Sequence, residues 1–258
     1  MATAVPITDA GDERLGDYLR LTDAELRRRG DTFLCEGLLV IRRAVEAGVT
    51  LRSLLLTPER FDVLAADIAG IDAPAYVVPQ PVMNTVTGFN IHRGAIAAAV
   101  RPPEPPLESL LTGRTIALLE GINDVENLGA LFRNAAAFGV DAVLLDPTSA
   151  DPFYRRCVRV SLGHVLAVPF ARIDGYDAIE AAGFELVALT PDPSAESVDV
   201  LDDLERVALL LGAEGPGLAP TTLARAHRRV RVPMVRGVDS LNVATAAAVA
   251  FHRRFRGE

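Results

Sequence analysis

Short apolar runs alternate with amphipathic stretches along almost the whole chain, and this alternation predicts an α/β fold. In the first hundred residues the runs are typical of strands and the longer stretches of helices. The expected strands are 33–36, 51–56, 75–78 and 95–100, and the expected helical segments are 15–29, 38–47, 61–69 and 82–86, after a polar lead of a dozen residues. These residues predict a small α/β unit.

A proline-rich segment, RPPEPPLESLL at residues 101–111, interrupts the alternation. Proline lacks a backbone N–H and fixes its own backbone angle, so four prolines in this run disfavour both helix and sheet. The sequence therefore predicts an N-terminal domain at residues 1–101, a linker at 102–111 and a second domain at 112–258.

Beyond the linker the alternation is stronger, and the strand candidates are nearly continuous apolar runs. Such runs are expected where helices cover both faces of a parallel sheet. The expected strands are 115–119, 142–145, 165–170, 185–190, 207–212 and 230–235, and the expected helices are 128–138, 153–159, 176–182, 221–226 and 241–255.

Three turns of this second domain hold residues that a simple loop does not require. The first, NDVENLGALFRNAAAFG at residues 123–139, has Asn127 at the expected helix start and Arg133 further along. Side chains tilt toward a helix N-terminus, so Arg133 is expected to reach back over Gly129 toward the loop. An N-cap asparagine with a surface arginine remains the alternative.

The second turn, LGAEGPGL at residues 211–218, is glycine-rich and carries one charge, Glu214. It has neither the lysine of a Walker phosphate loop nor the glycine spacing of a dinucleotide fingerprint. The pattern is typical of an ordinary glycine-proline turn or of a backbone that approaches a ligand closely.

The third turn follows Val232 and Met234 and ends at SLNV, residues 240–243, before an alanine-rich helix. Ser240 is a natural N-cap for that helix. Asn242 is a mediocre helix former within the expected first turn, which favours a functional role.

Together the three turns resemble the N-x-G-x-x-x-R, G-x-E-G-x-G-L and I-P-M…S-L-N-V-x-x-A motifs of the SpoU–TrmH class of SPOUT RNA methyltransferases, with Val232 in place of the usual isoleucine. Residues 159–163, RVSLG, resemble another segment of that family. Glu36-Gly37 and His92-Arg93-Gly94 resemble, less specifically, signatures of the ribosomal-protein-like domain often fused ahead of it. The resemblance implies a SPOUT-type parallel sheet with a C-terminal trefoil knot, preceded by a small α/β RNA-binding domain.

The resemblance also implies an activity, methylation of a ribose 2′-hydroxyl in ribosomal or transfer RNA with S-adenosylmethionine as cofactor. By position, the cofactor would contact Gly212, Val232 and Leu241, with Thr190 and Met234 as further candidates. Catalysis would involve Arg133, Asn127, Glu214, Ser240 and Asn242. In that family the motif arginine is thought to remove the hydroxyl proton with help from a substrate phosphate, although a guanidinium is a poor base by its reference pKa. Members are generally homodimers, in which this arginine completes a site near the other subunit.

Composition changes this expectation in one respect, because the net charge of −8 opposes a nucleic-acid partner. Every basic residue is arginine, however, and arginine binds phosphate in a bidentate manner. The clusters proposed to contact RNA are 27–29, 42–43 and 225–231. Neither the two cysteines nor the four histidines have metal-ligand spacing, so no metal is expected. With no secretory signal and no membrane span expected, the sequence predicts a cytoplasmic protein.

Three alternatives remain at this point. A non-catalytic RNA-binding module of the same fold is opposed by the retained Arg133, Glu214, Ser240 and Asn242. A base methyltransferase is opposed by the intact N-x-G-x-x-x-R motif. A doubly wound NAD enzyme would need the dinucleotide fingerprint, which the chain lacks.

Overall fold

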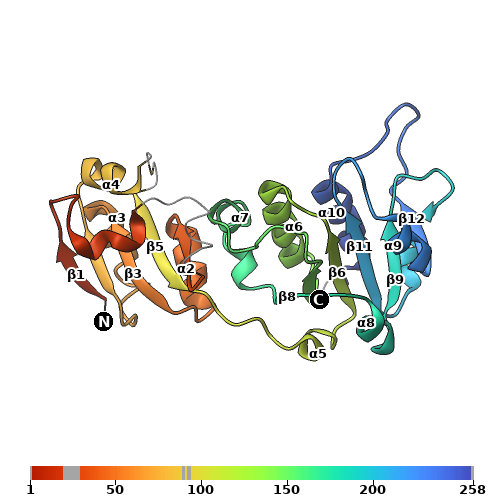
Figure 1. Cartoon of the computed structure of the whole chain (residues 1–258), viewed down its shortest axis with the longest axis horizontal. Helices are drawn as coiled ribbons and strands as arrows, with labels where there is room; N and C mark the ends of the chain where they lie inside the picture. The colour runs from red at the N-terminus through yellow and green to blue at the C-terminus, as the bar shows by residue number, and fades with distance from the viewer. Residues whose placement is uncertain (1, 20–29, 89–90, 92–93, 257–258) are drawn as a thin grey trace. The chain divides into compact units, whose positions relative to one another are not determined.

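The computed structural model describes residues 2–19, 30–88, 91 and 94–256, and these form two compact units. The first unit contains Met1–Pro103 together with Phe153–Ala167, and the second contains Glu104–Pro152 and Val168–Glu258 (Figure 1). The proline-rich segment thus lies at the change from one unit to the other. One segment of the expected second domain, however, belongs to the first unit.

The first unit is built on a five-stranded mixed sheet with the strand order β1-β4-β3-β5-β2. Strands β1, β4 and β3 are mutually parallel, while β5 runs antiparallel to both β3 and β2. Its elements are β1 Thr3–Pro6, η1 Glu13–Tyr18, β2 Thr32–Glu36, α2 Leu38–Glu46, β3 Leu51–Leu56, α3 Pro58–Leu64, β4 Pro74–Val77, α4 Gln80–Thr87, β5 Ala95–Val100, α7 Arg155–Val160 and η2 His164–Leu166.

The sequence predicts no strand at the position of β1, because these residues fall in the polar lead. Strand β1 is an edge strand with largely exposed side chains, held by parallel pairing to β4, so it needs no apolar run. Of the helix expected at 15–29, the structure shows a 3₁₀ helix at Glu13–Tyr18, and residues 20–29 lie outside the described residues. His92 and Arg93 also lie outside them.

The segment Phe153–Ala167 joins the first unit through aromatic and charged contacts. The rings of Phe153 and Phe33 lie 4.6 Å apart. Glu36 at the end of β2 is buried and accepts hydrogen bonds from Arg155 at 3.1 Å and Arg159 at 3.3 Å. A buried carboxylate must be paired, so Glu36 holds Arg155 and Arg159 of this segment. The second compact unit therefore differs from the domain expected at 112–258 over these fifteen or so residues, and the domain boundaries stay a prediction.

The second unit is a seven-stranded sheet, β10-β12-β9-β11-β6-β7-β8, in which every neighbouring pair is parallel. Helices α6 and α10 lie on one face and α8 and α9 on the other (Figure 1). Its elements are α5 Leu107–Leu110, β6 Thr115–Glu120, α6 Val125–Ala137, β7 Ala142–Leu145, β8 Phe170–Arg172, α8 Asp177–Ala181, β9 Glu185–Leu189, β10 Glu196–Ser197, η3 Val198–Asp203, β11 Val207–Gly212, α9 Pro220–Arg225, β12 Arg228–Arg231 and α10 Val243–Arg254.

Alternate residues of the central strands fill the two layers beside this sheet. Ile116 and Leu118 of β6 pack with Ala208 and Leu210 of β11 in one buried cluster, together with residues of α5, α8 and α9. The intervening residues of both strands are buried as well. The strands read as continuous apolar runs for this reason, as expected for a covered parallel sheet. The trefoil knot stays a prediction.

Two further local expectations are wrong. Leu107–Leu110 forms a short helix within the segment predicted to have none, because the four prolines all precede it. The strand expected at 165–170 is a 3₁₀ turn at His164–Leu166 followed by β8 at Phe170–Arg172. An apolar run of this length does not distinguish a strand from a buried turn.

Candidate cofactor and catalytic site

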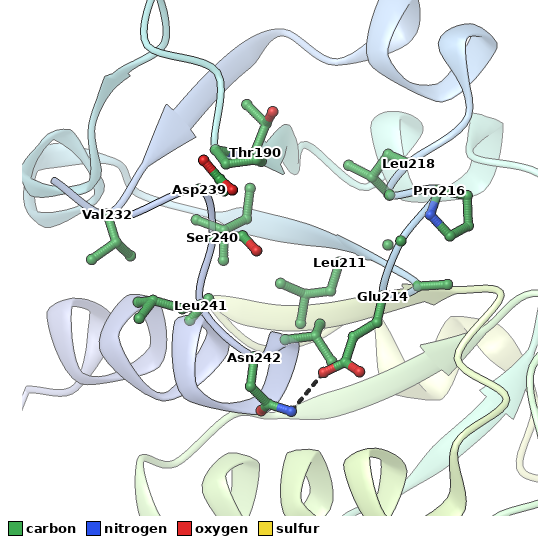
Figure 2. Close-up of a pocket in the computed structure, with 18 of the residues that line it drawn as sticks. Thr190, Leu211, Glu214, Pro216, Leu218, Val232, Asp239, Ser240, Leu241 and Asn242 are labelled. Carbon is green, nitrogen blue, oxygen red and sulfur yellow. Dashed lines mark hydrogen bonds between the residues drawn. The ribbon is translucent and has the colours of Figure 1, made fainter. Parts of the chain in front are cut away.

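A cavity of about 780 Å³ lies in the second unit at the carboxyl ends of β9, β11 and β12. Ligands of parallel α/β sheets bind at this edge, and the volume is that of a small-molecule site. All five residues predicted to bind a cofactor line it, namely Thr190, Gly212, Val232, Met234 and Leu241. Glu214, Ser240 and Asn242 line it as well. Figure 2 shows Glu214 and Pro216 across the cavity from Val232 and Leu241.

The loop after β11 forms one wall, and its glycines are required by geometry. A Cβ atom on Gly212 would lie 2.3 Å from the carbonyl carbon of Gly217 and 2.3 Å from the backbone nitrogen of Leu218. Gly215 and Gly217 have φ angles of +87° and +70°, which other residues rarely adopt. Because the Gly217 N–H donates to the Ala213 carbonyl at 2.9 Å, the loop is a tight turn whose backbone faces the cavity.

The segment between β12 and α10 forms the opposite wall. Strand β12 ends at Arg231, earlier than predicted, so Val232 and Met234 lie in the loop. The predicted N-cap Ser240 is wrong: Asn242 caps α10, because its Oδ1 accepts from the backbone nitrogens of Ala244 at 2.9 Å and Thr245 at 3.2 Å. Ser240 is therefore left exposed at the cavity.

Asn242 also joins all three motif loops. Its Nδ2 donates to Asn127 Oδ1 at 2.7 Å. It also donates to Glu214 Oε1 at 2.6 Å (Figure 2). The side chain thus makes four hydrogen bonds, two that begin α10 and two that connect α10 to the turns after β6 and β11. Sequence reasoning predicted that these three residues act together, and the structure brings them into direct contact.

Asn127 is not the N-cap of α6, contrary to expectation. Asp124 holds that position, and its Oδ1 accepts from the backbone nitrogens of Glu126 at 2.7 Å and Asn127 at 3.1 Å. The side chain of Asn127 is therefore available to Asn242. Asn127 also lines a second cavity of about 580 Å³. This cavity adjoins the first along residues 213–218, and its other lining residues include 120–124, Thr148 and Pro220.

Arg133 lies apart from both cavities. It is exposed on α6, and among the described residues it has neither an ion pair nor a hydrogen-bond partner. The next residue, Asn134, donates to the Ala244 carbonyl at 2.8 Å and connects α6 to α10. Within one chain, the predicted reach of Arg133 back to the loop is not seen. Its catalytic role stays a prediction.

The turn after β6 is held by the loop after β7. Asp146 Oδ1 accepts from the backbone nitrogens of Gly121 at 3.0 Å and Ser149 at 2.9 Å, and Oδ2 accepts from Thr148 Oγ1 at 2.5 Å. Burial raises the pKa of Asp146, but the hydrogen bonds from Ser149, Thr148 and Gly121 outweigh it, so its pKa lies below the ordinary value. Asp146 thus shapes the motif turn that carries Asn123 and Asp124.

Two carboxylates near the cavities were missed by sequence reasoning. Asp239 lines the first cavity from the third loop, and its place directly before Ser240 was the available signal. Glu120 ends β6 and lines the second cavity. A lone glutamate at the end of an apolar strand carries no signal that separates it from a solvated residue.

The arginine clusters proposed to contact RNA are largely occupied by acidic neighbours. Arg225 pairs with Asp177 and Glu180, and Arg228 with Glu185 and Glu196. In the first unit Arg42 pairs with Asp67 at 2.8 Å. These pairs lower the positive charge that each cluster offers to phosphate. Arginines 27–29 lie outside the described residues.

The described residues show no group of three or more potential metal-binding side chains. None of the described helices is both long and apolar enough to cross a membrane. Cys35 and Cys157 are buried, unbridged thiols, and burial raises the pKa of Cys35 to about 12.

The chain belongs to the SpoU rRNA Methylase family, whose sequence profile matches residues 114–252. An uncharacterised tRNA/rRNA methyltransferase of Mycobacterium tuberculosis is 45% identical over 97% of this chain and 91% of that protein. A 23S rRNA guanosine 2′-O-methyltransferase of Bacillus subtilis, RlmP, is 29% identical over 96% of this chain and 98% of that protein. The predicted family is thereby confirmed.

Solved structures agree in fold. An rRNA methyltransferase of Sinorhizobium meliloti with bound AdoMet is 28% identical, covers 97% of each chain and superposes with a TM-score of 0.81. An RNA 2′-O ribose methyltransferase is also 28% identical, covers 96% of this chain and 97% of its own, and gives a TM-score of 0.76. The predicted α/β class with a parallel sheet is confirmed.

Proposed function

We propose that this protein transfers a methyl group from S-adenosylmethionine to a ribose 2′-hydroxyl of ribosomal RNA. One observation carries the proposal: the five residues predicted to bind the cofactor, three by their place in the family motifs and two as further candidates, line one cavity at the carboxyl edge of the sheet. The names of the relatives support RNA as the substrate, and the relatives from Bacillus subtilis and Acinetobacter baylyi both act on a guanosine of 23S rRNA. Transfer RNA is the second candidate substrate, and the cytoplasm is the compartment where both RNAs occur.

The residues present fit this cofactor. The loop that begins at Gly212 offers backbone in place of side chains, and a Cβ at that position would collide with it. The other lining residues are mainly apolar, with Glu214 and Asp239 supplying negative charge for a cationic ligand. Gly212, Val232, Met234 and Leu241 would hold the cofactor, which supplies an activated methyl group when bound.

The protein must then orient a ribose hydroxyl and accept its proton. Asn127, Glu214 and Asn242 form one hydrogen-bonded cluster between the two cavities, so they would fix the loops on either side of the ribose. Ser240 is exposed beside them and can bind the ribose directly. None of these contacts supplies a positive charge for the RNA phosphate.

We assign that charge to Arg133 of a second copy in a homodimer. Arg133 is exposed and lines neither cavity of its own chain, so a partner copy is the natural source of the arginine that the site lacks. The exposed side chains of Val235 and Val238, at 77% and 46%, lie in the loop beside the cavity and offer apolar surface to such a partner.

The test is incubation of the protein with methyl-labelled S-adenosylmethionine and unmodified 23S rRNA or total transfer RNA. We expect label in RNA, and nuclease digestion should recover it as a 2′-O-methylated nucleotide. Label on a base would indicate a base methyltransferase. Absence of cofactor binding in calorimetry would favour a non-catalytic RNA-binding module instead.

A further inference from the structure

Glu120 occupies a special position relative to the glycine-rich loop at residues 212–218. In the sheet, β6 pairs with β11 so that Glu120 lies directly opposite Gly212, the residue at which the loop begins. Its side chain reaches the other end of the loop, where Oε1 accepts from the Ala219 N–H at 2.6 Å. One residue therefore contacts both ends of the loop.

The second carboxylate oxygen of Glu120 connects the end of β6 to the helices α8 and α9. Glu120 Oε2 accepts from the hydroxyl of Tyr176, just before α8, at 3.1 Å and from the hydroxyl of Thr222 in α9. Thr222 is buried and Tyr176 half-buried, so these bonds form in a partly water-excluded environment, where charged hydrogen bonds are strong. Both oxygens have protein donors, which leaves Glu120 poorly suited to accept a proton from substrate.

We propose that Glu120 is a positioning residue that holds the loop at residues 212–218 in its cofactor-binding conformation. Gly215 and Gly217 give the loop backbone freedom, and at its far end the Glu120 bond acts beside the buried side chain of Leu218 and the Leu223 N–H bond to the Ala219 carbonyl. Loss of the Glu120 bond would loosen this end and let Leu218 move away from the cavity wall. The proposal rests on the proposed function, because it assigns the cavity to S-adenosylmethionine.

Three variants test it by calorimetric titration with S-adenosylmethionine. Glu120→Asp keeps the charge but is one methylene shorter, so it should lose the bond to Ala219 and weaken cofactor binding about tenfold. Glu120→Gln keeps an acceptor at full length and should stay within about threefold of wild type. Tyr176→Phe removes one hydroxyl, leaves the Ala219 bond intact, and serves as the matched control.

Steady-state assays with RNA should show the loss in the Glu120→Asp variant as a raised KM for the cofactor with a nearly unchanged kcat. If Glu120 only stabilised the overall fold, a raised KM for the cofactor with an unchanged kcat would not be expected. Equal cofactor affinity in Glu120→Asp and wild type would overturn the proposal, and so would a Glu120→Gln variant as weak as Glu120→Asp.

Hydrogen–deuterium exchange of the cofactor-free protein separates this proposal from the proposed function. In Glu120→Asp, the peptide over residues 212–222 should exchange faster than in wild type, while the peptide over residues 142–150 should not. If wild type binds no S-adenosylmethionine, the proposed function is wrong, and the exchange data alone decide whether Glu120 holds the loop. Unchanged exchange at residues 212–222 would then refute its positioning role.

Discussion

The wall of the cofactor cavity and the helix that carries Arg133 differ in one respect. A single chain forms the whole wall, but it leaves Arg133 outside both cavities. The wall is built from loops that converge at the carboxyl edge of one sheet, and Asn242 donates one hydrogen bond to Glu214 in such a loop and one to Asn127 at the start of α6. Arg133 lies on the exposed side of α6, without a partner among the described residues. The chain thus assembles the cavity that we propose for the methyl donor, whereas the charge that would meet the RNA is not assembled.

The difference assigns separate effects to the two regions. Substitutions in the wall should weaken cofactor binding, because the wall is where we propose that the cofactor binds. A substitution of Arg133 should leave cofactor binding intact and affect only the transfer step, since an exposed side chain outside the cavity does not support the wall.

The largest effect is expected for Arg133→Ala. Loss of a cation that orients substrate and stabilises developing charge typically costs 100-fold or more, so we expect the transfer rate to fall by at least ~100-fold. Calorimetry with S-adenosylmethionine should give an affinity close to wild type. Equal losses of binding and transfer would refute the role of Arg133, and Arg14→Ala, outside the proposed RNA-contacting clusters, serves as an arginine control in the first unit.

Mixing two inactive variants sharpens this prediction. If Arg133 acts on the partner's cavity, a heterodimer of Arg133→Ala with a cofactor-binding variant such as Gly212→Val contains one complete site. Random exchange of subunits should then restore about a quarter of the wild-type activity. If Arg133 acts within its own chain, the mixture should stay inactive.

The next largest effect is expected for Gly212→Ala. The added methyl group would meet the backbone at Gly217 and Leu218 at 2.3 Å, and backbone atoms cannot move aside as a flexible side chain can. Overpacking of this kind costs about 1–3 kcal/mol, so cofactor affinity should fall by ten- to 100-fold, roughly. Gly70→Ala is the matched control, because nothing lies within 4 Å of its Cβ position. If Gly212→Ala bound the cofactor as tightly as wild type, the loop at residues 212–218 would not form a wall of the cofactor site.

The wall could be predicted from the sequence because its residues cluster in the chain. Gly212 and Glu214 fall in one short loop, and Ser240, Leu241 and Asn242 are consecutive, so each motif marks its own loop. Each motif also follows a strand of the parallel sheet, and the carboxyl ends of these strands meet at one edge. What the motifs did not give is the local geometry: the two helix caps are Asp124 and Asn242, not Asn127 and Ser240.

Other features depend on contacts between distant residues and leave no local pattern. The segment Phe153–Ala167 joins the first unit because Glu36 is buried against Arg155 and Arg159, more than a hundred positions away in sequence. Glu120 is likewise paired with Ala219 and Thr222. Strand β1 forms because β4 offers it an edge. Periodicity describes which face is buried but not which partner covers it.

A smaller effect is expected for Asn242→Asp, which separates the two roles of Asn242. Aspartate caps a helix as well as asparagine, so the free energy of unfolding should change little. The Nδ2 donor to Glu214 and Asn127 is replaced by a carboxylate beside another carboxylate, and cofactor affinity and transfer should fall about tenfold. Asn242→Ala should add a stability loss of about 1 kcal/mol in urea titration. If Asn242→Asp were fully active, the hydrogen bonds from Asn242 to Glu214 and Asn127 would not be needed for cofactor binding or transfer.

The smallest effect concerns Asp146, which supports the turn after β6 and touches none of the cofactor wall. Its folded pKa lies below the ordinary value, so its contribution to stability is complete above the unfolded pKa of about 4 and is lost as the pH falls through the folded pKa. Urea titration of wild type and Asp146→Asn should therefore show a stability gap near pH 7 that narrows as the pH falls below the unfolded pKa of about 4. Cofactor affinity should be equal in the two proteins near neutral pH. Transfer should be slower in the variant, because an amide oxygen accepts from Gly121 and Ser149 more weakly than a carboxylate does, and the amide nitrogen cannot accept from Thr148. A gap that stayed constant with pH would mean that the Asp146 carboxylate does not hold the turn, and a loss of cofactor affinity would mean that the two regions are not independent.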